Sequence, residues 1–322
     1  VIEHGSSFTR VMLAGNVTVV MLFMVNAIFR GSGDAAIAMR TLWLANWINI
    51  ILGPCLIFGL GPFPKLGIVG AAIATNIGRG TGALFALSRL FKSGGRFEIK
   101  REHLRLEPAI MWRLVRLSAT GTFQVFIGMA SWIGLTRILA GFGSSALAGY
   151  TIGIRIIVFA LLPSWGMSNA AATLVGQNLG AQKPERAERA VWIAGFYNMI
   201  FLGVVGLLFI AGAPVLIRFF TIDPGVAPYG IACLRYVSYG FLFYAYGMVI
   251  TQAFNGAGDT WTPTWLNLFV FWLWEIPLAY FLATTAGWGP RGVFIAITIA
   301  FSTLAVASAA LFRRGKWKLK KV

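Results

Sequence analysis

Apolar stretches of helical length, separated by short polar breaks, follow one another along almost the whole chain. They cover residues 8–29, 37–60, 67–91, 109–140, 146–178, 188–212, 229–254, 263–286 and 291–312. A helix needs about 20 mostly apolar residues to cross a bilayer, and each stretch reaches that length. The strands of a membrane β-barrel would instead alternate polar and apolar residues over roughly 10 positions, and that alternation is absent. The pattern predicts an all-α integral membrane protein with nine transmembrane helices.

The composition supports this class. Of the 322 residues, 58% are hydrophobic and 11% are charged, whereas a soluble domain carries roughly 25% charged residues. The net charge of +17 would suggest nucleic acid as a partner of a soluble protein. Basic residues at the ends of apolar segments are instead typical of cytoplasmic loops. We therefore expect membrane lipid around the chain and no nucleic acid partner.

Lysine and arginine are unevenly distributed between the two sets of alternate loops. Four fall on one set, and sixteen fall on the other set and the C-terminal tail. Positively charged loops face the cytoplasm, so residues 313–322 are predicted to form a basic cytoplasmic tail. After an odd number of spans, residue 1 is expected outside, with residues 1–7 forming an extracellular connection. The sixteen are Arg30, Arg40, Lys92, Arg96, Lys100, Arg101, Arg105, Lys183, Arg186, Arg189, Arg313, Arg314, Lys316, Lys318, Lys320 and Lys321.

An internal repeat relates the two parts of the chain. At an offset of 225 residues, Phe29–Asp34 (FRGSGD) falls on Phe254–Asp259 (FNGAGD). Without a gap, the same offset pairs Trp47 with Trp272, Ile51 with Ile276, Gly67 with Gly292 and Ala71 with Ala296. Such clustered matches favour a duplicated unit. Six helices per unit is an even number, so both units would enter the membrane from the same side as a parallel repeat.

The repeat also predicts the domain organisation. Residues 1–91 are expected to be the C-terminal half of an N-lobe, containing its helices 4–6, and residues 92–108 a cytoplasmic inter-lobe loop. Residues 109–312 then form a complete C-lobe with helices 7–12. On this interpretation the chain is an N-terminally truncated piece of a twelve-helix bundle.

Enzyme chemistry finds little support in the sequence. The two histidines, His4 and His103, lie far apart, and no HExxH or CxxC pattern is present. The glycine-rich stretches lack a following Lys-Ser/Thr and a βαβ setting. A membrane-embedded enzyme is therefore the least favoured class, and no metal or cofactor is expected.

Glu275 is the one carboxylate near the middle of a predicted span; the other nine fall in loops or at span ends. An ionisable group at membrane depth is expensive and is a functional candidate by default. Two interpretations stay open for it. It could carry the coupling ion, or it could stay ionised in a structural pair with Arg79, Arg137 or Arg155.

The remaining candidate residues are polar side chains in the other spans and the residues of the two repeated turns. Asp34 and Asp259 each follow a Gly-x-Gly sequence and open a helix, so we interpret them as N-caps in tight cytoplasmic turns. Amides and hydroxyls within spans either line a wet cleft or bond between helices. The turn residues are Gly31, Gly33, Asp34, Gly256, Gly258 and Asp259, and the cleft candidates are Asn46, Gln124, Arg155, Gln252 and Asn267.

Four motifs in order resemble a known transporter family. They are RGSGD (30–34), GIVGAAIAT (67–75), GQNLGAQKPERA (176–187) and NGAGDT (255–260), followed by Pro263 and Ile276–Tyr280. Together they resemble the multidrug and toxic compound extrusion (MATE) family in its DinF-like branch, from about residue 20 to residue 312. The resemblance implies two six-helix lobes around a central cleft, and antiport of organic cations or other amphiphiles against H⁺ or Na⁺.

Family sites carry over only in part. By resemblance, the DinF-like cation site combines a first-helix carboxylate with an Asn and an Asp one turn apart on the fifth helix and a Thr on the sixth. Asn49 and Thr75 match two of these positions, while Gly53 stands at the Asp position. The other large branch uses acids on the seventh and tenth helices, and no carboxylate lies near Gly128 or Tyr244. Glu275, Asn49 and Thr75 are therefore the ion-coupling candidates.

The sequence favours a secondary active exporter that works by alternating access in the bacterial inner membrane, as a monomer. Its substrates would be small amphiphilic or cationic compounds. A flippase for lipid-linked precursors is the alternative, and it would need a cleft lined by arginine and lysine to hold pyrophosphate. Convergence of Arg79, Arg137 and Arg155 on one cavity would favour the flippase, whereas an aromatic, weakly acidic cavity would favour drug efflux.

Overall fold

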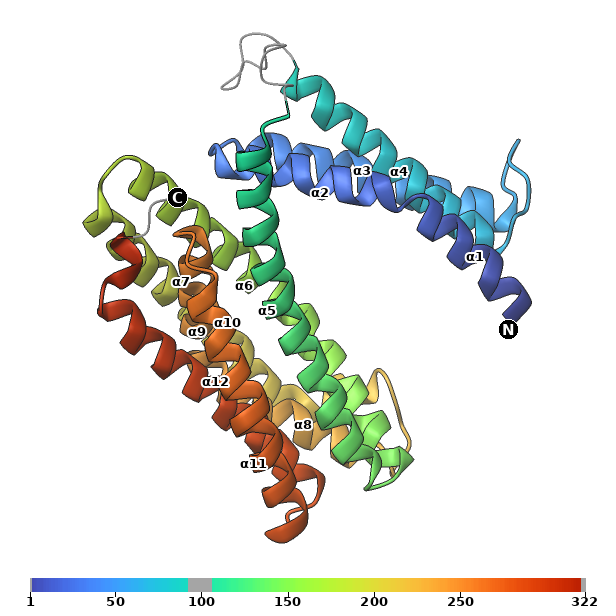
Figure 1. Cartoon of the computed structure of the whole chain (residues 1–322). Coiled ribbons are helices and arrows are strands. Elements are labelled where there is room, and N and C mark those ends of the chain that lie inside the picture. The colour runs from blue at the N-terminus through green and yellow to red at the C-terminus, as the bar shows by residue number, and fades with distance from the viewer. Residues whose placement is uncertain (1, 92–105, 320–322) are drawn as a thin grey trace. The chain divides into compact units, whose positions relative to one another are not determined.

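The computed structural model describes residues 2–91 and 106–319, and every regular element in these ranges is helical. The chain divides into two compact units, Val1–Leu106 (unit 1) and Glu107–Val322 (unit 2). This division falls within the predicted inter-lobe loop 92–108, most of which lies outside the described residues, as do Lys320 and Lys321 of the tail. Figure 1 shows the helices of each unit.

Unit 1 contains four helices, with a bend between the first two. They are α1 (Ile2–Ala14), α2 (Asn16–Gly31), α3 (Ala35–Phe58) and α4 (Ile68–Leu90). Residues 1–7 were expected to form an extracellular connection, and this is wrong, because the chain is helical from Ile2. The α1–α2 bend is 43°. Asn76 of α4 lies against Gly15 at the break and donates from Nδ2 to the Val11 carbonyl at 2.7 Å. The Val11 carbonyl also accepts the helical bond from the Gly15 N–H at 3.1 Å, and the Thr18 N–H then bonds to the Gly15 carbonyl only three residues back, so the regular ladder changes at this break.

Small residues bring α3 and α4 into close contact. A Cβ on Gly78 would lie 2.6 Å from the Ala45 carbonyl oxygen, and one on Gly70 would lie 2.7 Å from the Leu56 carbonyl carbon. Ala72 and Ala74 are fully buried in α4. Such close backbone packing is how membrane helices associate without a hydrophobic driving force between them.

Unit 2 is built around long helices that enclose one main core. The first five are α5 (Pro108–Ala140), α6 (Ser144–Gly180), α7 (Pro184–Arg218), α8 (Ala227–Tyr239) and α9 (Phe241–Gly256). A composite helix follows, made of α10 (Trp261–Asn267), η2 (Leu268–Glu275), α11 (Ile276–Tyr280) and η3 (Phe281–Thr285), and α12 (Pro290–Arg313) ends the bundle. Buried residues from eight of these elements, including Leu135, Leu202, Leu234, Phe241 and Phe294, form the core.

The number of spans is lower than nine by the criterion of helix length and hydropathy. In the described part of the chain, six helices are long and apolar enough to cross a membrane, or seven if the bent pair α1–α2 is one span. The predicted spans 67–91 and 229–254 are also helical, but the first contains Arg79 and Arg89 and the second is divided at Gly240. The multi-pass helical class is therefore confirmed, and the count of nine is not.

The composite helix contains a π-helical stretch that ends at Glu275. In η2 the backbone closes bonds over five residues, such as the bond from the Ile276 N–H to the Phe271 carbonyl. The next bond of that register, to the Trp272 carbonyl, cannot form because Pro277 has no N–H. The predicted bend at Pro277 thus takes the form of a π-helical distortion, which often marks functional positions in helices.

The two repeated turns have the same backbone structure. In the first, the Asp34 N–H bonds to the Phe29 carbonyl at 2.8 Å, and in the second the Asp259 N–H bonds to the Phe254 carbonyl at 2.9 Å. Gly33 and Gly258, with φ of 83° and 76°, supply the left-handed residue that ends each helix.

The N-cap interpretation of the two aspartates needs correction. Asp34 occupies the N-cap position of α3 but makes no side-chain cap hydrogen bond. The N-cap residue of α10 is Thr260, so Asp259 precedes it, and the Asp259 Oδ2 accepts a hydrogen bond from the Thr262 hydroxyl at 2.7 Å.

The gapless alignment of the repeat also needs correction beyond these turns. Gly67 and Gly289 begin α4 and α12 with nearly the same backbone angles, φ 56° and ψ −134° against φ 58° and ψ −145°. Gly70 and Gly292 both pack on the preceding helix, against Leu56 and Leu282 respectively. The offset between equivalent residues is 225 at the turns, 226 between Leu56 and Leu282, and 222 between Gly70 and Gly292. The second repeat therefore has one more residue than the first in its composite helix and four fewer in the connection that follows.

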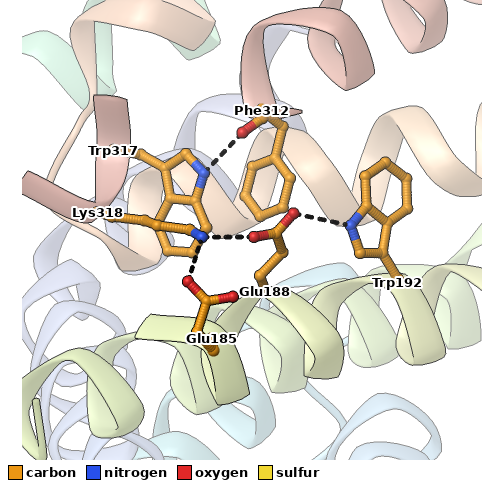
Figure 2. A network of polar contacts seen from close by, with 6 residues as sticks. All are labelled: Glu185, Glu188, Trp192, Phe312, Trp317 and Lys318. Atoms are coloured by element: carbon orange, nitrogen blue, oxygen red, sulfur yellow. Dashed lines mark hydrogen bonds and ion pairs between the residues drawn. The ribbon is translucent and has the colours of Figure 1, made fainter. Parts of the chain in front are cut away.

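The C-terminal segment was expected to be a basic cytoplasmic tail, and part of it is packed against unit 2. Residues Lys316–Leu319 form a 3₁₀ turn, η4. Trp317 is fully buried, and its ring stacks on the Phe312 ring with centroids 4.5 Å apart. Its Nε1 donates a hydrogen bond to the Phe312 carbonyl at 2.9 Å. Lys318 Nζ pairs with Glu185 at 2.9 Å and with Glu188 at 2.6 Å (Figure 2). We call this arrangement the C-terminal clasp.

Candidate ion-coupling site

Glu275 is buried inside unit 2, beside a small cavity. Its side chain is 1% exposed, and neither carboxylate oxygen has a hydrogen-bond partner among the described residues. The cavity holds about 30 Å³ and is enclosed by α5, α6, α8, α9, η2 and α12. Since one water needs about 10–15 Å³ of such space, the cavity has room for about two water molecules.

Aromatic rings form much of the cavity wall. They belong to Trp132, Tyr150, Phe241, Tyr244 and Phe301. The Tyr150 ring stacks on Phe294 with centroids 6.2 Å apart, and the Tyr244 ring lies 4.2 Å from that of Phe301. These ring contacts fix the wall in place. Apart from Glu275, the only polar side-chain groups in the wall are the Trp132 indole N–H and the hydroxyls of Tyr150 and Tyr244.

Among residues 2–91 and 106–319, no basic side chain pairs with Glu275. Arg137 and Arg155 are exposed, and neither lines the cavity. In the described ranges, the ion pairs at salt-bridge distance are those of Lys318 with Glu185 and Glu188. The pairing considered for Glu275 with Arg137 or Arg155 is therefore not formed. Arg79 is half-buried in α4 of unit 1.

This environment suits a proton better than a metal cation. Hard metal cations are held by several oxygen ligands, and the cavity wall offers two carboxylate oxygens and two phenols. A carboxyl group needs no such shell when it is protonated, and burial in apolar surroundings favours the neutral acid. The site can thus take up and release a proton when water reaches it.

Buried polar groups of α5 and of the composite helix face one another between this site and the end of unit 2 that contains Asp259. The Thr120 and Thr260 hydroxyls are 2.6 Å apart, and the Thr264 hydroxyl lies 3.5 Å from the Thr120 carbonyl. The Trp272 indole N–H donates to the Ile127 carbonyl at 3.1 Å. We call this interface the polar seam; its side chains are Thr120, Gln124 and Ser131 of α5, and Thr260, Thr264, Asn267 and Glu275 of the composite helix.

The candidates of unit 1 form one contact. Asn49 of α3 donates from Nδ2 to the Thr75 hydroxyl of α4 at 2.9 Å, and that hydroxyl also bonds to the Ala71 carbonyl at 2.8 Å. Gly53 lies one turn beyond Asn49, and a Cβ there would meet no atom within 4 Å. The structure thus joins two of the residues that the resemblance indicated, and it leaves space where the family has an acid.

The remaining candidates are dispersed. Gln124 and Asn267 are both buried in the polar seam. Asn46 and Arg155 are exposed, and Gln252 accepts a hydrogen bond from Asn255 Nδ2 at 3.2 Å. Trp132 and Tyr150 were not among the predicted site residues, because nothing in the apolar pattern distinguishes a ring that lines a cavity from one that faces lipid.

Comparison with known proteins adds independent information. A family model described as MatE matches residues 119–281. A probable multidrug resistance protein NorM of Thermotoga maritima is 25% identical over 320 residues, which cover 99% of this chain and 69% of that protein. An FAD transporter of Shewanella oneidensis is 29% identical over 312 residues, covering 92% of this chain and 65% of that protein.

Solved structures agree with these sequence matches. An outward-facing multidrug resistance MATE family transporter of the MOP superfamily superposes with a TM-score of 0.89 at 25% identity, covering 98% of this chain and 70% of that one. A MOP superfamily transporter of Pyrococcus furiosus superposes with a TM-score of 0.90 at 26% identity and the same coverage. The chain thus spans between 65% and 70% of the length of these similar proteins.

Proposed function

Because this chain belongs to the multidrug and toxic compound extrusion (MATE) family, we propose that it takes part in export of small organic cations or other amphiphiles in exchange for protons. In this proposal Glu275 takes up the proton, and the bacterial inner membrane is the site of action. The observation that carries the proposal is a carboxyl group that has no hydrogen-bond partner in the described part of the chain and lies beside a water-sized cavity inside a membrane protein. Acids in that situation mark proton relays and ion pathways.

Several observations support the substrate class. The similar proteins include a "probable multidrug resistance protein" from each of Thermotoga maritima and Bacillus subtilis. The FAD transporter of Shewanella oneidensis carries a different compound, so the family match supports a small-molecule cargo rather than one particular drug. Asn49 and Thr75 support assignment to the DinF-like branch.

The distribution of charge supports a cytoplasmic C-terminus. Contacts gather the N-termini of α5, α7 and α10 and the C-termini of α6, α9 and α12 at one end of unit 2, which we call the Asp259 end. Arg137, Arg155, Arg218, Arg235 and Arg291 lie toward the opposite end. Positively charged ends of membrane bundles face the cytoplasm. The basic residues toward the Asp259 end are Arg113, Arg116, Lys183, Arg186, Arg189, Arg313, Arg314, Lys316 and Lys318.

Flippase activity toward lipid-linked precursors is less well supported. It requires basic side chains around the substrate, and the wall of the Glu275 cavity contains neither arginine nor lysine. The aromatic, weakly acidic character of that wall favours exchange of cations and protons instead.

Replacement of Glu275 by glutamine tests the proposal, with the protein expressed from its complete gene and reconstituted into liposomes. Uptake of a cationic dye such as ethidium is followed under a pH gradient and, separately, under a Na⁺ gradient. We expect pH-driven exchange in the wild type and its loss in Glu275→Gln, because the amide keeps the shape of the acid but cannot exchange a proton.

Asp34→Asn serves as the control, since Asp34 lies in a turn and should leave the exchange near the wild-type rate. Thermal unfolding of both variants separates loss of coupling from loss of fold. A well-folded Glu275→Gln protein that still couples dye movement to the pH gradient contradicts the proposal, and exchange driven by Na⁺ alone contradicts the choice of ion.

A further inference from the structure

The polar seam connects Glu275 with one end of unit 2. On the composite helix, Thr260, Thr264, Asn267 and Glu275 follow at spacings of four, three and eight residues, which keeps them on one helical face. On α5, the buried residues Thr120, Gln124 and Ser131 follow the same face at spacings of four and seven. The two faces meet, as the contacts of Thr120 with Thr260 and Thr264 establish.

The seam begins where water is close and ends at the buried acid. Thr260 follows the turn that contains Asp259, at the end of unit 2 where the basic residues gather. Gln124 and Asn267 lie deeper and are 9% and 8% exposed. The Asn267 Oδ1 is buried without a hydrogen-bond partner among the described residues, so it retains an acceptor that a water molecule can use.

Polar groups continue in the interval between Asn267 and Glu275. These two residues are eight positions apart, which is a rise of about 12 Å along a helix. Trp272 contacts the Ile127 carbonyl and Ile276 lies against Gly134, so Ser131 falls within this interval. Ser131 is 1% exposed, and its hydroxyl donates to the Gly128 carbonyl at 2.8 Å, so its oxygen can still accept a hydrogen bond. The Trp272 carbonyl lacks its helical donor because of Pro277.

The groups facing Glu275 offer no competing acceptor for its proton. Tyr150 of α6 and Tyr244 of α9 are the titratable residues in the cavity wall, and α5, α8 and α12 contribute tryptophan and aliphatic or phenylalanine side chains. One wall residue, Trp132, is 42% exposed, so the cavity lies close to the surface of unit 2 there. The interface between α5 and the composite helix offers a second route, because buried amides and hydroxyls follow one another along it toward the Asp259 end.

We propose that the polar seam is the path by which protons pass between Glu275 and the Asp259 end of unit 2. The proton leaves the carboxyl group, moves along water held by the amides of Asn267 and Gln124 and the hydroxyls of Ser131, Thr264 and Thr120, and is taken up by bulk water. The amides hold and orient water and are not themselves protonated. This inference rests on the proposed function, since it assumes that Glu275 exchanges protons.

Gln124→Leu and Asn267→Leu test the path in the reconstituted protein. Both replacements remove a water-holding amide while filling its space, so we expect proton-coupled dye exchange to slow by about tenfold with KM for the dye unchanged. Because proton movement would then limit the rate in these two variants, replacing H₂O by D₂O should slow their exchange by a larger factor than it slows exchange by the wild type. Asn267→Ser keeps a water-binding hydroxyl and should retain most of the rate.

Asn178→Leu is the matched control, because Asn178 is an amide near the same end that donates to the Leu174 carbonyl of its own helix at 2.7 Å. It should leave both the rate and the isotope effect unchanged. If Glu275→Gln abolishes exchange while Gln124→Leu and Asn267→Leu exchange at wild-type rates, the path is wrong and the proposed function stands. If the wild type shows no pH-driven exchange, the proposed function itself fails.

Discussion

Asn49 of α3 aligns with Glu275 of η2 when the residue added in the composite helix is placed in the π-helical stretch η2. The offset of 226 residues that relates Leu56 to Leu282 relates Asn49 to Glu275. The offset of 222 that relates Gly70 to Gly292 relates Thr75, the partner of Asn49, to Ile297, which lines the Glu275 cavity. Unit 1 thus has a satisfied amide–hydroxyl pair where unit 2 has a carboxyl group beside an aliphatic side chain.

This equivalence predicts an energetic coupling between positions 275 and 297. In the Glu275→Asn background, Ile297→Thr should reproduce the pair of unit 1 and gain a hydrogen bond worth about 1 kcal/mol. In the wild-type background the same change gains no such bond. A double-mutant cycle of thermal stability measures the difference, and strictly additive effects would contradict the equivalence.

The repeated turns predict opposite outcomes for one substitution. A Cβ on Gly256 would lie 2.7 Å from the Ala172 Cα and 2.8 Å from its carbonyl carbon, whereas one on Gly31 would meet nothing within 4 Å. Gly256→Ala should therefore force α6 and α9 apart and destabilise the protein by about 2 kcal/mol or more. Gly31→Ala should be close to neutral. Comparable melting temperatures for the two variants would contradict the close approach of α6 and α9.

Gln182 is predicted to be a site where glycine stabilises the protein. It is the one residue other than glycine with a left-handed φ, 56°, among those described. Its turn also has the hydrogen bonds of the two repeated turns, including a 2.8 Å bond from the Lys183 N–H to the Asn178 carbonyl. Gln182→Gly should relieve up to about 1 kcal/mol of strain, and Gln182→Ala should not. The melting temperatures of both variants test this.

The C-terminal clasp should contribute measurably to stability. Trp317→Ala should cost about 3 to 5 kcal/mol, because it empties a fully buried site. Lys318→Gln should cost about 1 kcal/mol, since its ion pairs are partly exposed. High salt should lower the melting temperature of the wild type more than that of Lys318→Gln. Equal salt dependence would show that the ion pairs contribute nothing.

The pH dependence of the clasp follows from the same ion pairs. The hydrogen bonds with Glu188 and then Glu185 raise the pKa of Lys318 above its ordinary value of 10.5. A pKa that is higher in the folded state means that this contribution is complete below pH 10.5 and is lost as the pH rises through the folded value. The difference in stability between the wild type and Lys318→Gln should therefore persist at neutral pH and shrink in strong alkali.

Elements with local causes could be predicted from the sequence. The apolar stretches gave the helical segments because a membrane helix is defined by its own residues, and the FxGxGD turns were recognisable because each needs a glycine in the left-handed region. Glu275 was identifiable for a similar reason, as an acid distant from any loop.

Features that depend on packing between distant segments could not be predicted. The cavity beside Glu275 needs Trp132, Tyr150 and Tyr244, which lie on three other helices and have no distinguishing pattern. The register shift at η2 adds one residue without changing the apolar character of the segment. From the sequence alone, Trp317 appears within a basic tail. Its burial depends on contacts with Phe312 and on the ion pairs of Lys318 with the acids of α7, and these contacts form only in the folded bundle.

The π-helical stretch has a consequence for how duplicated halves diverge. One additional residue in a regular α-helix would turn everything after it by about 100°. A π-helical stretch absorbs the added residue locally, so Leu282 keeps the contact with Gly292 that Leu56 makes with Gly70. Specialisation of one half, with an acid where the other half has an amide, is thus reachable through an insertion followed by one replacement at position 275.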